Sequence, residues 1–192
     1  AGTETAQGNA DGNGIGDFYY TPRTNHLAMC TANMPDPVAA IDPAESGSPQ
    51  DYFNTVLYTG AGSGANANTV NTVGFQPDFT WIKNRGDDES HILQDSVMGV
   101  ANFLQSDTTT QDQDTGGGDI HTFNSAGFIL GYANNRSNAT NDTYVAWNWK
   151  AGTAFSNDAS STSVGSIDST GSVNTDVGFS IINYVGSGGN GT

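Results

Sequence analysis

A segment near the N-terminus has the spacing of a calcium-binding loop. Residues 9–17 read NADGNGIGD, so oxygen-bearing side chains alternate along the segment and a glycine stands sixth. Calcium takes oxygen ligands from alternate positions of such loops. The bidentate glutamate of the twelfth position is missing, because Tyr20 stands there. A Gly/Asn turn before a strand at Phe18 explains the same residues and is the favoured interpretation, with calcium as the alternative.

A second group of residues could suggest glycoside cleavage, which needs two carboxylates on either side of one bond. The candidates are Asp87-Asp88-Glu89 and Asp95. They follow Lys83-Asn84-Arg85-Gly86 in what the pattern predicts to be a hairpin connection. An exposed acidic turn, partly balanced by two cations, is favoured over a catalytic pair.

The remaining residue types form no recognisable reactive pattern. His26, His91 and His121 are too far apart in sequence for a local metal motif, and neither HExxH nor CxxC occurs. The run Gly116-Gly117-Gly118 lacks the lysine of a phosphate loop. Cys30 is the single cysteine, which we expect to be a small buried hydrophobe. The sequence therefore predicts no enzyme, no catalytic residue, no metal ligand set and no cofactor.

Four triplets match the pattern for N-linked glycosylation. They are Asn135-Arg136-Ser137, Asn138-Ala139-Thr140, Asn141-Asp142-Thr143 and Asn190-Gly191-Thr192. A chain this rich in Asn, Ser and Thr produces such triplets by composition alone, so they carry no functional prediction.

The charge of the chain excludes several classes of partner. Five Lys and Arg stand against 20 Asp and Glu, which gives a net charge of −15 in 192 residues. Binding to nucleic acid or anionic lipid needs clustered cations, so neither is expected. No apolar run approaches the roughly 18 residues of a membrane span. The first residues lack the features of a signal peptide, and we expect the chain to be a piece of a longer polypeptide.

Short β-branched and aromatic runs between Gly, Ser, Thr, Asn and Asp loops predict strands. The expected strands are 18–20, 53–58, 79–83, 91–93, 127–130, 143–149 and 178–184. Helix signals are nearly absent. The fold class is therefore all-β, an antiparallel β-sandwich of jelly-roll or lectin-like type, with modules in tandem. In the strand at 143–149, Val145, Trp147 and Trp149 share one face, which we expect to pack in the core.

One internal repeat sets the expected domain boundaries. The pattern Phe53-x-x-Val56-x-Tyr58-x-Gly60-x-Gly62 returns 126 residues later as Phe179-x-x-Ile182-x-Tyr184-x-Gly186-x-Gly188. Residues 52–165 are then one β-sandwich domain, and 166–192 are a linker and the first strand of a second, incomplete repeat. Residues 1–51, which contain five prolines, form the end of an earlier domain and a Pro-rich linker.

Three stretches resemble structural proteins of marine tailed phages. Residues 18–37, with 53–60, resemble the C-terminal end of SPRY-like domains in such proteins. Residues 74–85 (GFQPDFTWIKNR), with 90–91, 95–99, 144–152 (YVAWNWKAG) and 178–181, resemble an uncharacterised β-domain that follows those segments. The chain departs from the family pattern at Met98, where Arg is usual, and at 22–26, where Pro-Pro-x-Gly-Tyr is usual.

The resemblance implies a virion structural protein. The favoured place is a tail fibre or appendage used in assembly or host attachment. Its partners would be other copies of itself, as a homotrimer, other virion proteins and a host-surface glycan. Few aliphatic residues and no disulfide also favour self-association. Alternatives are a capsid decoration or head-fibre protein, a secreted carbohydrate-binding module of a marine bacterium and, least favoured, a glycan depolymerase. The expected location is the virion, an extracellular particle.

Overall fold

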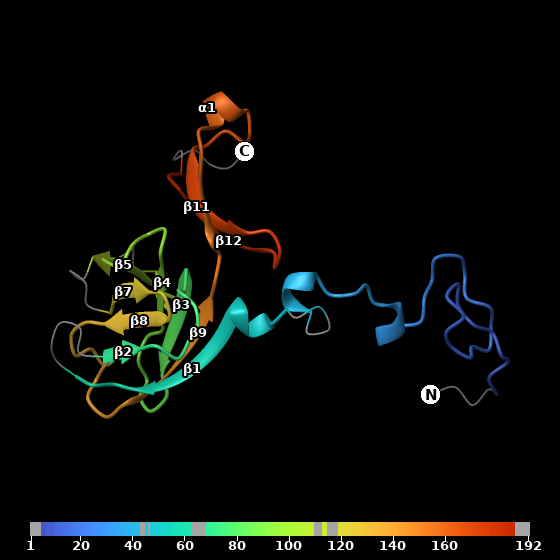
Figure 1. The fold of residues 1–192 in the computed structure, drawn as a ribbon, viewed down its shortest axis with the longest axis horizontal. Coiled ribbons are helices and arrows are strands. Elements are labelled where there is room, and N and C mark those ends of the chain that lie inside the picture. Colours follow the sequence, from blue (N-terminus) through green and yellow to red (C-terminus); the bar gives the residue numbers. More distant parts are fainter. Residues whose placement is uncertain are drawn as a thin grey trace. The chain divides into compact units, whose positions relative to one another are not determined.

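The computed structural model describes residues 5–42, 45, 47–62, 68–109, 113–114 and 119–186. The chain divides into two compact units, Ala1–Pro37 and Val38–Thr192. Three antiparallel sheets make up the second unit, with almost no helix (Figure 1). The prediction of an all-β antiparallel sandwich is thereby confirmed. The expected boundaries at residues 51/52 and 165/166 stay predictions.

The large sheet has the strand order β1-β9-β3-β4-β5-β6. Its strands are β1 Phe53–Thr59, β3 Phe79–Asn84, β4 Ile92–Asp95, β5 Asn102–Gln105, β6 Gln113–Asp114 and β9 Thr143–Trp149. At one end of the edge strand β1, Phe53 lies opposite Trp149. The ladder continues past that end, since the Lys150 N–H donates to the Tyr52 carbonyl at 2.8 Å.

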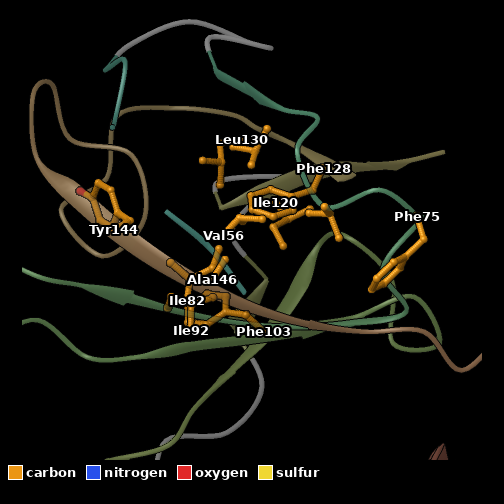
Figure 2. Packing of buried hydrophobic residues seen from close by; sticks show 12 residues of the cluster. Val56, Phe75, Ile82, Ile92, Phe103, Ile120, Phe128, Leu130, Tyr144 and Ala146 are labelled. Carbon is orange, nitrogen blue, oxygen red and sulfur yellow. The ribbon is translucent and has the colours of Figure 1, made fainter. Parts of the chain in front are cut away.

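The second layer is a small sheet of order β2-β8-β7. It is formed by β2 Asn68–Val70, β7 Ile120–Asn124 and β8 Gly127–Leu130. The core lies between the two layers, where Ile120, Phe128 and Leu130 of the small sheet face Ile82 and Ala146 of the large one (Figure 2). These five side chains are fully buried.

Polar side chains also point into this core, and each has hydrogen-bond partners, as burial requires. The hydroxyl of Thr80 donates to Asn148 at 3.1 Å, and both residues are fully buried. Asn138 donates to two buried glycine carbonyls and accepts from the Ala61 N–H and the Asn68 amide. Burial raises the pKa of Asp119, although Ser137 and Arg136 both bond to its carboxylate.

A third sheet follows, with order β10-β11-β12. Its strands are β10 Thr153–Asn157, β11 Ser169–Asn174 and β12 Phe179–Tyr184, and the one-turn helix α1 Ala159–Thr162 lies in the connection after β10. Few of its side chains are buried, and Ile182 and Tyr184 are 57% and 63% exposed. This sheet therefore has apolar side chains but no core of its own among the residues the structure describes.

The first unit is held by turns rather than by a sheet. Short 3-10 helices occur at η1 Thr31–Asn33 and, at the start of the second unit, at η2 Ala39–Ile41 and η4 Pro49–Asp51. The strand expected at 18–20 is wrong, because only Phe18 pairs, in a single bridge with Asn9. Cys30 is half-buried rather than buried as expected.

Most other expected strands are present within a residue or two, at β1, β3, β4, β8, β9 and β12. The expected core face of β9 is wrong. Tyr144, Ala146 and Asn148 are fully buried, whereas Trp147 and Trp149 lie on the opposite face and are partly exposed. The side chains alternate along this strand as predicted, but both faces carry large apolar side chains, so hydrophobicity alone does not identify the inner face.

Candidate functional site

The calcium-like segment is organised around Asp11. Its Oδ1 accepts the N–H groups of Asn13 and Ile15, and its Oδ2 accepts the Ala28 N–H and the Asn33 amide at 2.7–2.9 Å. These bonds, that from Ala28 first, lower the pKa of Asp11 to about 2. Both carboxylate oxygens thus hold the loop together through protein N–H donors.

The candidate carboxylates occupy the two ends of one strand pair. Asp87 and Asp88 are exposed in the turn between β3 and β4, as predicted for an acidic hairpin connection. Asp95 lies opposite Phe79, at the far end of β3, and its Oδ1 accepts the N–H groups that follow it. The five residue steps of β3 between these ends span about 17 Å. Glycosidase pairs lie about 5–9.5 Å apart, so these residues do not form one.

The histidines lie on separate segments of the chain, and the sequons differ in their exposure. No three His, Cys, Asp or Glu side chains gather as a metal site among the residues that the structure covers. The side chain of Asn138 is buried in the core, whereas Asn135 and Asn141 are exposed. The sequon at Asn190 and the run 116–118 lie outside the described residues.

The feature that stands out is the outer face of the large sheet, which we call the aromatic face. It is defined by the side chains that point away from the core on five strands. They are Phe53, Thr55 and Leu57 of β1, Val145, Trp147 and Trp149 of β9, Phe79, Trp81 and Lys83 of β3, Leu93 and Asp95 of β4 with the preceding His91, and Leu104 of β5. All three tryptophans of the chain belong to it.

The rings of this face contact one another across the strands. Trp149 lies 4.9 Å from Phe53 and 5.2 Å from Phe79, measured between ring centroids. Trp81 meets Trp147 edge to face at 5.9 Å, and its indole N–H donates to His91 Nδ1 at 2.9 Å. Such cross-strand aromatic pairs stabilise a sheet. The face is therefore a continuous packed layer rather than a set of separate rings.

One residue of the third sheet contacts the aromatic face. Phe179, the first residue of β12, stacks on Trp149 at 6.1 Å with an angle of 21° between the rings. Phe179 and Phe53 occupy equivalent places in the internal repeat. Trp149 thus contacts both repeat-related phenylalanines.

Asp78 positions one end of the aromatic face. Its Oδ2 accepts the N–H groups of Ala151 and Gly152 at 2.8 Å, and its Oδ1 accepts the Ser96 hydroxyl at 2.9 Å. The carboxylate therefore links the end of β9 to the segments beside β3 and β4. Gly152 has φ +93°, a conformation that side chains disfavour, which explains the glycine at this place.

The aromatic face is unusual in its exposure and charge. Leu57 and Leu104, on its two sides, are 62% and 44% exposed. Its charged members are Lys83 and Asp95, so the face is neutral on a chain of charge −15. The outer face of the small sheet has Ile129 between Thr69 and Thr122 instead. An extended apolar sheet face with a few polar residues is typical of an interaction surface.

Sequence reasoning missed this surface because it placed the tryptophans inside. A signal was present: β9 alternates Trp and Val on one face with Tyr, Ala and Asn on the other, so one of two apolar faces had to point outward. The neighbouring Phe79 and Trp81 repeat the pattern on β3. Together they predict a sheet that is apolar on both sides.

The comparisons with known proteins identify a family but no function. No curated protein and no solved structure matches the chain. None of the described helices is long and apolar enough to cross a membrane. The model of one family, a domain of unknown function (DUF7483), matches residues 48–192, which are most of the chain and include all three sheets. The chain therefore belongs to the DUF7483 family.

Proposed function

We propose that the chain is a non-catalytic structural part of a tailed-phage virion, in a tail fibre or similar appendage built from tandem β-sandwich modules. It would act in assembly or host attachment, as part of a homo-oligomer in contact with other virion proteins. The resemblance of residues 74–85 and 144–152 to such proteins supports the proposed location in a virion. The exposure of β12 supports the proposal of a modular chain.

The observation that carries the proposal is the exposure of β12. Ile182 and Tyr184 correspond in the repeat to Val56 and Tyr58 of β1, which face the core of the sandwich. In β12 both side chains are largely exposed. A strand with core-type residues and no core is explained if it begins a second module, because the following strands would bury these side chains. Tandem modules joined in this way are suited to an extended fibre.

The proposal assigns the candidate carboxylates a structural rather than a catalytic role. Asp87 and Asp88 lie at the opposite end of β3 from Asp95, and every buried side-chain N or O atom of the described residues has a hydrogen-bond partner. The proposal does not require a cofactor. The calcium interpretation of residues 9–17 remains a separate prediction, and calorimetry with calcium and with a chelator tests it.

The test is to locate the chain in purified particles of the phage that encodes it. We expect mass spectrometry to find its peptides in the virion, and antibodies against residues 48–192 to label the tail appendages by immunogold electron microscopy. Labelling of the head would instead support a capsid decoration or head fibre. Absence from intact particles would overturn the virion proposal.

Carbohydrate binding is the second candidate, and the partial exposure of two tryptophan rings on the aromatic face is the observation behind it. Partly exposed Trp81 and Trp147 are side chains that can stack on sugar rings. A secreted binding module would bind on a glycan array, and Trp147→Ala would abolish that binding. The same result within a virion would assign host recognition to this face.

A further inference from the structure

We propose that the aromatic face binds a second copy of this chain. This inference deepens the proposed function, on which it rests, by naming the surface through which copies associate. Three observations identify the occupant: the chemistry of the face, its charge and the residue that already covers one corner of it.

The chemistry of the face suits protein rather than sugar. Sugar recognition needs open ring surfaces next to hydrogen-bonding groups. Here one side of the Trp149 ring is stacked by Phe179, and the indole N–H of Trp81 is bonded to His91. The exposed Leu57 and Leu104 extend the face to its sides with aliphatic groups, which pack against apolar protein surface.

The charge of the face suits a partner as acidic as the chain itself. Two copies, each of charge −15, repel one another over most of their surfaces. On the aromatic face the positive charge of Lys83 and the negative charge of Asp95 cancel. A second copy can therefore approach here without the like-charge contacts that an acidic surface would impose.

The corner at Trp149 indicates the kind of surface that packs on this face. Phe179, which covers Trp149, belongs to a strand whose sequence repeats that of β1. Phe53 of β1 contacts the same indole from within the sheet. The face thus already packs against the aromatic side chain of a β1-type strand. A second copy presents further aromatic and aliphatic side chains of the same kind.

The size of the face sets the expected strength. Four strand spacings from β1 to β5 span about 19 Å and the length of β9 about 20 Å, which gives a footprint of about 400 Å². Standard interfaces bury about 800 Å² on each partner, so we expect weak pairing of isolated chains. Neighbouring modules in one assembly would strengthen it, because they raise the effective concentration.

Tryptophan fluorescence gives a direct readout, because all three tryptophans lie on the aromatic face. We expect the emission to shift to shorter wavelength, and quenching by acrylamide to decrease, as the concentration rises from about 5 to about 500 µM, the range that separates micromolar from millimolar affinity. Light scattering in parallel should give a mass that rises from 19.9 kDa toward a multiple of it.

The matched variants are Leu57→Glu, on the aromatic face, and Val164→Glu, 65% exposed in the connection before β11. Both replace an exposed apolar side chain by a carboxylate, so the fold should tolerate both, and unchanged thermal melting at low concentration checks this. Leu57→Glu should keep the mass at 19.9 kDa throughout, whereas Val164→Glu should associate like the unmodified chain.

Three outcomes would overturn the inference. They are a monomer at every concentration, association that Leu57→Glu leaves unchanged, and glycan binding through this face by a chain that does not self-associate. A chain that is monomeric in this test but present in tail fibres would refute the surface and leave the proposed function standing.

Discussion

Replacing Asp78 by alanine should destabilise the sandwich by about 4 kcal/mol, a large part of the 5–15 kcal/mol typical of a domain. The carboxylate accepts three hydrogen bonds, from the Ser96 hydroxyl and from the N–H groups of Ala151 and Gly152. Ala151 is fully buried, so its N–H would lose its partner without gaining water, at a cost of about 2 kcal/mol. The other two donors can be hydrated, and their lost bonds cost about 1 kcal/mol each.

Urea unfolding followed by tryptophan fluorescence measures this effect, because the tryptophans all lie on the large sheet. Smaller changes should give graded results. Ser96→Ala removes one bond and should cost about 1 kcal/mol. Asp78→Asn keeps the shape but loses the charge, and should cost about 1–2 kcal/mol. Asp88→Ala removes the same charge from an exposed turn and is the control, with an effect within about 0.5 kcal/mol.

Unfolding free energies of Asp78→Ala and Asp88→Ala within about 1 kcal/mol of each other would refute this account, since losing three hydrogen bonds, one of them to a buried N–H, must cost more than removing an exposed charge. The same would follow if Ser96→Ala were the most damaging of the set. Either result would mean that the end of β9 is held by packing of its aromatic rings rather than by this carboxylate.

Three further predictions concern other parts of the chain. Asn138→Ala should cost about 3–5 kcal/mol in urea unfolding, because two buried carbonyls lose their donors; a cost below about 1 kcal/mol would contradict the network. Asp11, whose pKa is lowered from 3.8 to about 2, stabilises the N-terminal unit above pH 3.8, and this contribution is lost as the pH falls from there toward 2. The Ala28 amide resonance should report the loss, and Asp11→Asn should abolish its pH dependence. In a glycosylating host, peptide mapping of the folded product should find glycan at Asn135 or Asn141 but not at Asn138, whose amide is buried.

The sequence predicted the strands whose side chains alternate strongly, and β9 is the clearest. What it did not predict is which face of β9 is inner. Trp147 and Trp149 are larger and more apolar than Ala146 and Asn148, yet the smaller residues are buried. The inner face of the large sheet packs against the small sheet, and on that inner face Asn148 of β9 bonds with Thr80 of the neighbouring β3. The space left by the opposite layer and hydrogen bonding to the neighbouring strand decide this, and neither is visible in one strand.

The strands β10 and β11 were missed for a related reason. Their residues, such as TAFSN at 153–157 and STGSVN at 169–174, have the composition of loops. Backbone pairing alone defines them, since few of their side chains are buried. The aromatic face likewise depends on register: Phe53, Phe79 and Trp149 become neighbours only because β1 and β3 flank β9.

The position of the sandwich's two ends has a mechanical consequence. Tyr52 and Lys150, where the chain enters β1 and leaves β9, are joined by a backbone hydrogen bond at the same end of an antiparallel pair. Tension between the flanking segments would therefore load that bond first and then peel the two strands apart one pair at a time, rather than shear the whole ladder at once. In the proposed appendage, drag would separate β1 from β9 at low force, and the ring contacts of Trp149 with Phe53 and Phe179 lie where this separation would begin.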